Sequence, residues 1–193
     1  MTVVDLDLDT KDQRFPTILA YKGIITMMVS FMILLALFSA DCSAENLSLE
    51  IPDHAWKVKF SGPSITKVKE MNTPSYYYYL GKADRFSLSL FVESPTCPGV
   101  ISVEDNQKCI LPKIEQIPGF QKQSLTINTL AKGIQIIYVA YAPMGDKAVK
   151  IMHTHILFAN RGKWGDLHAS IIQPTIEDIA QILRFGEGFD YSE

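Results

Sequence analysis

Residues 134–142, Ile-Gln-Ile-Ile-Tyr-Val-Ala-Tyr-Ala, are apolar on both faces of the strand that they would form. A run of this kind is typical of a central strand that is covered on two sides. Residues 150–159 and 163–173 follow it as a second strand pair, and Asn-Arg-Gly-Lys at 160–163 is the turn signal between them. The sequence therefore predicts a buried strand that leads into a hairpin.

The segments nearer the N-terminus are shorter. Residues 47–51, 56–60 and 85–93 alternate apolar and polar side chains, which is the period of half-buried strands. Residues 75–80 include four consecutive tyrosines, and alternation sends two of these rings to each face of a strand. We interpret the tyrosines as core and covering residues, with a ligand-binding aromatic surface as the alternative. Residues 123–130 are expected to form another strand.

The chain is predicted to end on a helix. Thr175 is a good N-cap residue, Glu177 and Asp178 complement the positive end of the helix dipole, and an apolar stripe runs through the segment. Sequential hairpins with a covering helix indicate an α+β fold, an antiparallel β-sheet covered by helices.

An export signal is indicated by residues 24–38, a segment without charge that follows Lys22 and leads into small residues. Cleavage before Glu45 is favoured over cleavage after Ala40. Residues 1–44 are thus interpreted as an N-terminal extension and signal peptide, which places the mature protein in the periplasm or outside the cell. The alternative is an uncleaved segment that anchors the protein in a membrane.

Cleavage at the favoured position leaves residues 45–193, which have the size of a single domain. Removing residues 1–44 takes away three basic and five acidic residues and leaves 15 against 16, a net charge of −1. Because nucleic acids and anionic membrane surfaces need clustered Lys and Arg, neither is an expected partner.

Two cysteines remain in the mature chain, Cys97 and Cys109. In an oxidising compartment an even pair is expected to form a disulfide, and this one would close a 13-residue loop. The surrounding residues, 95–119, are rich in Pro, Gly and polar side chains. We therefore expect an irregular excursion that the disulfide holds.

The order of these features resembles the PsbP-like superfamily. The resemblance rests on Leu-Glu-Ile-Pro-x-x-x-Trp-Lys-Val-Lys-Phe at 49–60, on residues 85–93, and on Gly-Lys-Trp-x-Asp-Leu-His-x-Ser at 162–170 with the helix start that follows. It implies a PsbP-like α/β/α sandwich over residues 45–191, close to the exported bacterial members of the superfamily. Those proteins mostly act in binding or assembly without a shared catalytic site.

One cluster of chemically active side chains follows from the predicted hairpin. If Arg161-Gly162 is a two-residue turn, opposed residues share a face of the sheet with Cβ atoms about 5 Å apart. The opposed pairs are then His155 with His168, Leu157 with Asp166, and His153 with Ser170. A one-residue bulge would reverse this parity and scatter the cluster.

The cluster allows three interpretations. His153, His155, Asp166 and His168 could hold a zinc or copper ion, since neutral imidazole and carboxylate suit both. Together with Ser170 they contain the residue types of a hydrolase, although Ser170 would lie inside a strand. We favour a hydrogen-bonded polar patch in which Asp166 fixes a histidine tautomer.

These observations together predict an exported, non-catalytic binding or assembly protein without a cofactor. Its partner would be another envelope protein or a small ligand. A metal-binding protein or metal-dependent hydrolase centred on the last hairpin is the first alternative. A membrane-anchored accessory protein is the second.

Overall fold

The structure is a computed structural model that describes residues 45–52, 56–95, 97 and 102–192. The predicted export signal, residues 24–38, and the extension before it lie outside these residues. Among the helices in the described part of the chain, none is long and apolar enough to cross a membrane.

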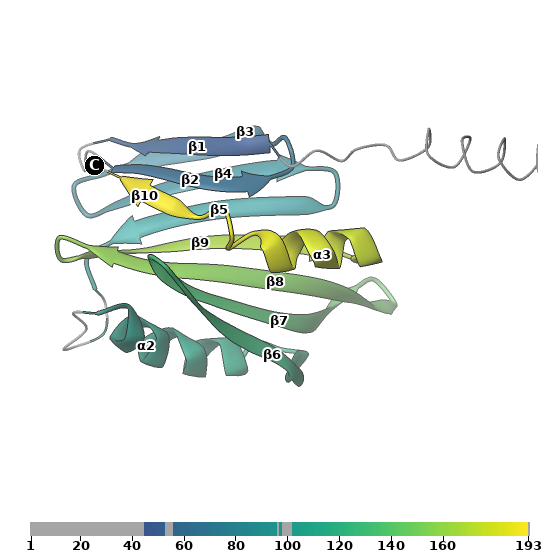
Figure 1. The fold of residues 1–193 in the computed structure, drawn as a ribbon. Coiled ribbons are helices and arrows are strands. Elements are labelled where there is room, and N and C mark those ends of the chain that lie inside the picture. The colour runs from purple at the N-terminus through teal and green to yellow at the C-terminus, as the bar shows by residue number, and fades with distance from the viewer. Residues whose placement is uncertain (1–44, 53–55, 96, 98–101, 193) are drawn as a thin grey trace, which may run out of the picture. The chain divides into compact units, whose positions relative to one another are not determined.

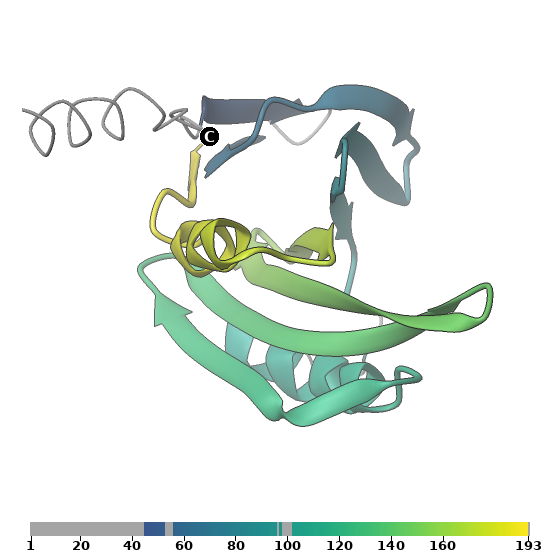
Figure 2. The same ribbon diagram turned by 90° about the vertical axis from the view of Figure 1, so that its right-hand side faces the viewer.

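The described strands form two antiparallel sheets (Figure 1). The smaller sheet has three strands in the order β1-β2-β10, and its strands are β1 Glu45–Ile51, β2 Trp56–Gly62 and β10 Asp190–Ser192. The larger sheet has seven strands in the order β3-β4-β5-β9-β8-β7-β6. Its strands are β3 Thr66–Asn72, β4 Tyr76–Ala83, β5 Phe86–Glu93, β6 Phe120–Leu130, β7 Gly133–Met144, β8 Lys147–Asn160 and β9 Lys163–Ile172. The longest of these strands curve strongly (Figure 2).

Two helices pack on opposite faces of the large sheet: α2, Val103–Glu115, and α3, Ile176–Arg184. Strand β8 shows this, because consecutive side chains along it point to opposite faces of the sheet and pack in different cores. Phe158 packs in the core that includes α3 and the small sheet, whereas Leu157 packs in the core beneath α2. The face of the large sheet that carries α2 is called the α2 face below.

The expected fold, a sheet covered by helices in a PsbP-like α/β/α sandwich, is wrong. Strands make up 62% of the described residues, and the described part has two helices. The physical reason lies in residues 47–51 and 56–60, which alternate as expected but pair with each other and with the C-terminal strand β10. They form a second sheet whose apolar side faces the main core, so strands supply much of the cover that we assigned to helices.

The expectation of an irregular excursion over residues 95–119 is also wrong, because α2 lies within it. Ser102 caps the helix by accepting a hydrogen bond from the backbone N–H of Asp105 at 3.1 Å. Pro112 lies inside the helix and removes one backbone hydrogen bond. Burial of Ile114 against β7 and β8 offsets that loss, which composition alone does not reveal.

Candidate functional site

The β8–β9 hairpin has the predicted two-residue turn. Arg161 and Gly162 have positive φ angles of 49° and 72°, as a turn that matches the twist of a hairpin requires. The register continues without a bulge and opposes His155 to His168, Leu157 to Asp166, and His153 to Ser170. The predicted cluster therefore assembles on the α2 face.

Within the cluster, the aromatic rings form a stack to which β7 adds Tyr138. The rings of Tyr138 and His153 lie 4.8 Å apart, those of His153 and His168 lie 5.3 Å apart, and those of His155 and His168 lie 4.2 Å apart, with interplanar angles of 14° or less. The His153 Nδ1 and His168 Nε2 atoms are 3.0 Å apart, so one ring donates a hydrogen bond to the other.

Asp166 fixes the orientation of one ring in this stack. Both carboxylate oxygens lie 3.0 Å from His155 Nδ1, and Tyr138 Oη lies 3.3 Å from His155 Nε2. A carboxylate only accepts, so Nδ1–H of His155 donates to Asp166. This is the hydrogen-bonded patch that the sequence analysis favoured.

Burial keeps two histidines of the stack, His153 and His168, from binding a second proton near pH 7. Loss of hydration, with the neighbouring His155 as a smaller cause, lowers the pKa of His153 to about 4. The same cause holds the pKa of His168 well below its usual value, with both other histidines adding to the effect. Burial also raises the pKa of Tyr138, which keeps its hydroxyl a donor. His153 and His168 are therefore neutral near pH 7.

The positions of these side chains give no support to the metal-binding and hydrolase interpretations. In the described part of the chain, no group of three or more His, Cys, Asp or Glu side chains is placed to hold a metal ion. The ring nitrogens of His153 and His168 bond to each other instead of converging on a common point. Ser170 lies inside β9, and within the described residues no hydrogen bond joins it to a histidine.

A cavity of about 150 Å³ lies beside the cluster, between α2 and strands β5 and β9. Its lining residues are Phe91, Glu93, Asn106, Ile110, Trp164, Gly165 and Asp166. Asn106 comes from α2 and is 2% exposed, and its Oδ1 is a buried atom without a hydrogen-bond partner. Buried polar atoms almost always have a partner, so an orphaned oxygen on a residue that lines the cavity marks a place where a donor is missing.

The pairing of the strands explains why this wall is both acidic and aromatic. Phe91 on β5 opposes Asp166 on β9, and Glu93 opposes Trp164. The next strand adds Tyr78 opposite Phe91. Because directly opposed residues share a face, these side chains meet on the α2 face although they come from three strands.

The four-tyrosine run divides as predicted. Tyr77 and Tyr79 are buried in the main core, while Tyr76 and Tyr78 lie half-buried on the α2 face. The ring of Phe91 stacks on Tyr76 with centroids 5.3 Å apart and meets the edge of Tyr78 at 6.0 Å. The outer pair of tyrosines thus continues the aromatic wall away from the cavity.

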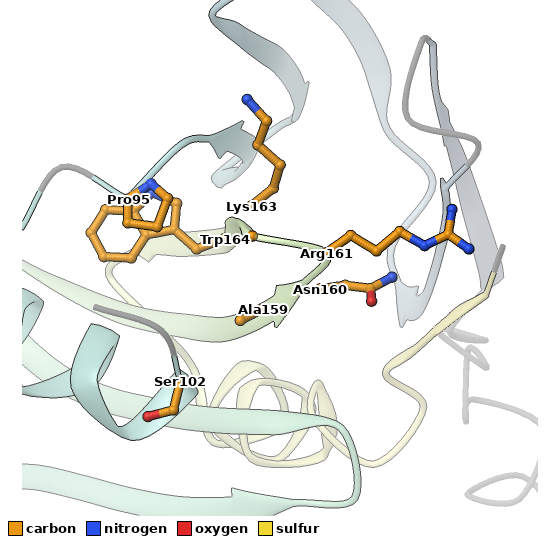
Figure 3. A pocket seen from close by; sticks show the side chains of 8 residues that line it. Pro95, Ser102, Ala159, Asn160, Arg161, Lys163 and Trp164 are labelled. Atoms are coloured by element: carbon orange, nitrogen blue, oxygen red, sulfur yellow. The ribbon is translucent and has the colours of Figure 1, made fainter. Parts of the chain in front are cut away.

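A second, larger cavity of about 630 Å³ lies at the β8–β9 turn (Figure 3). Its lining residues are Pro95, Ser102, Ala159, Asn160, Arg161, Gly162, Lys163 and Trp164. Arg161 and Lys163 extend from the turn in different directions in Figure 3. Lys163 Nζ donates to Ser94 Oγ at 2.8 Å. Trp164 lines both cavities.

The two cysteines lie next to this region. The sulfur atoms of Cys97 and Cys109 are bonded, and the Cα atoms are 6.2 Å apart, in agreement with the predicted disulfide. Cys109 is in α2, so the bond ties the helix that supplies Asn106 to the chain that leaves β5.

Sequence reasoning found the histidines and Asp166 but missed Phe91, Glu93, Asn106 and the cavities. One signal was present in β5. Ser87, Ser89 and Phe91 share a face, and a phenylalanine on an otherwise polar face indicates contact with something other than the main core. Asn106 gave no such signal, because its helix was not predicted.

Comparison with known proteins adds little to this description. No family model matches the chain, so the resemblance to the PsbP-like superfamily has no support from that comparison. No curated protein matches it either. A solved structure that is similar is that of LpqN, which is involved in cell envelope biogenesis of Mycobacterium tuberculosis. The identity is 12%, the TM-score is 0.41, and the match covers 80% of this chain and 88% of LpqN, so no function is transferred from it.

Proposed function

We propose that this is an exported, non-catalytic binding protein that holds a small ligand on the α2 face of its large sheet. The observation that carries the proposal is the pair of cavities of about 150 Å³ and 630 Å³ that share Trp164. Small-molecule sites are concave, largely apolar and equipped with a few placed polar groups. Trp164 and Phe91 supply the apolar walls, and Asp166 and Asn106 supply polar groups.

The contacts of His155, the ring that touches Asp166, support binding over catalysis. A general base must have a free nitrogen within reach of the proton that it removes. Both nitrogens of His155 contact protein groups, Asp166 and Tyr138, while one nitrogen of His153 and one of His168 are joined by a hydrogen bond. The stack therefore acts as a rigid support that orients Asp166 at the cavity.

Export is supported by the predicted leader and by the bonded pair Cys97 and Cys109. Disulfides persist in oxidising compartments and are rare in the cytosol. We propose the periplasm or the extracellular space as the place of action.

Native mass spectrometry of the protein recovered from the exported fraction tests this function. We expect a processed chain with an intact disulfide and one bound small molecule. Ile110, which is half-buried in α2, lines the smaller cavity, and Ile110→Phe would fill it. The matched control is Ile127→Phe, at a position on β6 that is 40% exposed.

The variant should lose the bound molecule while the control keeps it. Equal ligand content in both variants would contradict the location of the site. A full-length cytosolic product with reduced thiols would contradict export.

A further inference from the structure

We propose that the cavity beside α2 binds a small organic cation, an alkylammonium or guanidinium group, between the oxygens of Asp166, Glu93 and Asn106. This inference rests on the proposed function and names the class of its ligand. The inference is carried by the lining of one cavity of about 150 Å³, where these three polar residues from α2, β5 and β9 lie together with the aromatic residues Phe91 and Trp164.

The unpartnered oxygen of Asn106 favours a ligand that donates hydrogen bonds. Asn106 Oδ1 has no partner and is shielded from solvent, since the residue is 2% exposed. An unsatisfied buried acceptor is unfavourable, and a ligand that donates a hydrogen bond removes that penalty. Primary ammonium and guanidinium groups carry only donors, so they match a wall that offers acceptors.

The charge of the residues that line the cavity also favours a cation. Glu93 and Asp166 both line the cavity, and none of the described residues that line it is Lys or Arg. Glu93 forms no ion pair with another described residue. Asp166 contacts His155, and the two histidines behind it, His153 and His168, are neutral near pH 7. The cavity thus presents negative charge without a fixed positive charge in its wall, which favours a cation and disfavours an anion.

The aromatic residues that line the cavity favour a cation as well. Cations are attracted to the faces of Trp, Tyr and Phe rings, and quaternary ammonium ligands are recognised in this way. Trp164 and Phe91 line the cavity, and Tyr76 holds the Phe91 ring by stacking on it. Carboxylates with aromatic rings distinguish an organic cation from a hydrated metal ion, for which no described group of ligands is placed.

The size of the cavity limits the ligand. A space of 150 Å³ accommodates a molecule about as large as benzene. The cavity therefore takes a cationic head group, and Trp164 lines both this cavity and the larger one at the β8–β9 turn.

Titration of the protein with three probes tests the inference. The probes are butylammonium chloride, guanidinium chloride and 1-butanol, the neutral analogue of butylammonium with a hydroxyl in place of the ammonium group. The sequence has two tryptophans, Trp56 and Trp164, so Trp56→Phe leaves the cavity residue as the sole indole reporter. Calorimetry on the unaltered protein gives the affinities independently of that variant.

We expect butylammonium or guanidinium to bind at one site and to change Trp164 fluorescence, with the neutral analogue at least about tenfold weaker. Asp166→Asn and Glu93→Gln should each weaken the cation about tenfold or more. Glu104→Gln, an exposed carboxylate in the first turn of α2 outside the cavity, is the matched control and should have no effect. Because Glu93→Gln leaves the histidine stack untouched, it keeps the test valid if Asp166→Asn does not fold.

Equal affinity for butylammonium and 1-butanol, or binding unaffected by both cavity variants, would overturn the cation assignment. So would a cavity that binds none of the probes and holds only ordered water. If the exported protein still carried a neutral small molecule that Ile110→Phe removes, the proposed function would stand and only the ligand class would fail. If it carried nothing, both would fail.

Discussion

Acid should weaken this fold through the buried histidines. His153 and His168 are neutral in the folded protein because burial lowers the pKa of each, to about 4 for His153. In the unfolded chain both titrate near 6.5. Below pH 6.5 the unfolded state therefore binds more protons than the folded state, and stability falls as pH falls. The loss should run from about pH 6.5 down to the folded pKa and then level off.

The magnitude follows from the shift. At pH 5 the solution is about 1.5 pH units below the unfolded pKa of His153 and still above its folded pKa. At 1.36 kcal/mol per unit, this corresponds to a loss of about 2 kcal/mol in the free energy of unfolding. The ring is half-buried, so solvent screening reduces the expected contribution to about 1–2 kcal/mol. His168 acts in the same direction.

Urea unfolding of the protein and of His153→Gln at pH 7.5 and pH 5.0 measures this contribution. Glutamine does not titrate and keeps one hydrogen-bonding group near His168. The variant should lose about 1–2 kcal/mol less than the unaltered protein between the two pH values, whatever its stability at pH 7.5. Identical losses in both proteins would refute the burial of an uncharged His153.

Three further changes test the packing around the site. Replacing Cys97 and Cys109 with serine should lower the free energy of unfolding by about 3 kcal/mol, measured by urea titration, and an unchanged midpoint would contradict the disulfide. Gly165→Ala should lower stability by about 1–3 kcal/mol, because the added Cβ would overlap the Phe158 ring, and an equal melting temperature would contradict that contact. Thr175→Ala should cost about 0.5–2 kcal/mol by removing the cap of α3, and unaltered stability would mean that the capping box is not formed.

Local patterns predicted the candidate site better than the overall fold. The turn at Arg161-Gly162 fixes the register of β8 and β9, and register alone determines that His155 and Asp166 share a face. The alternation of the four tyrosines was equally readable, because side-chain direction in a strand has a period of two. Both predictions depend only on residues close in sequence.

The missed elements depend on distant contacts. Strand β3 is mostly exposed and has no apolar period, so nothing in its sequence marks it as a strand before β4 pairs with it. Strand β10 has three residues and owes its existence to β2, more than a hundred positions away. Helix α2 is stabilised by packing against β7 and β8 despite Pro112. The cavity could not be predicted from local patterns for the same reason, since its walls come from α2, β5 and β9, which are distant in sequence.

The most direct test of the cation site is a nuclear magnetic resonance titration of the ¹⁵N-labelled protein with butylammonium chloride. Two tryptophans give two indole N–H signals, one from Trp56 in the main core and one from Trp164 in the cavity wall. We expect a saturable shift of the Trp164 signal and of the backbone signals at Asn106 and Asp166, with the Trp56 signal unmoved. Shifts centred on Trp56, or spectra that butylammonium leaves unaltered, would contradict the cation site.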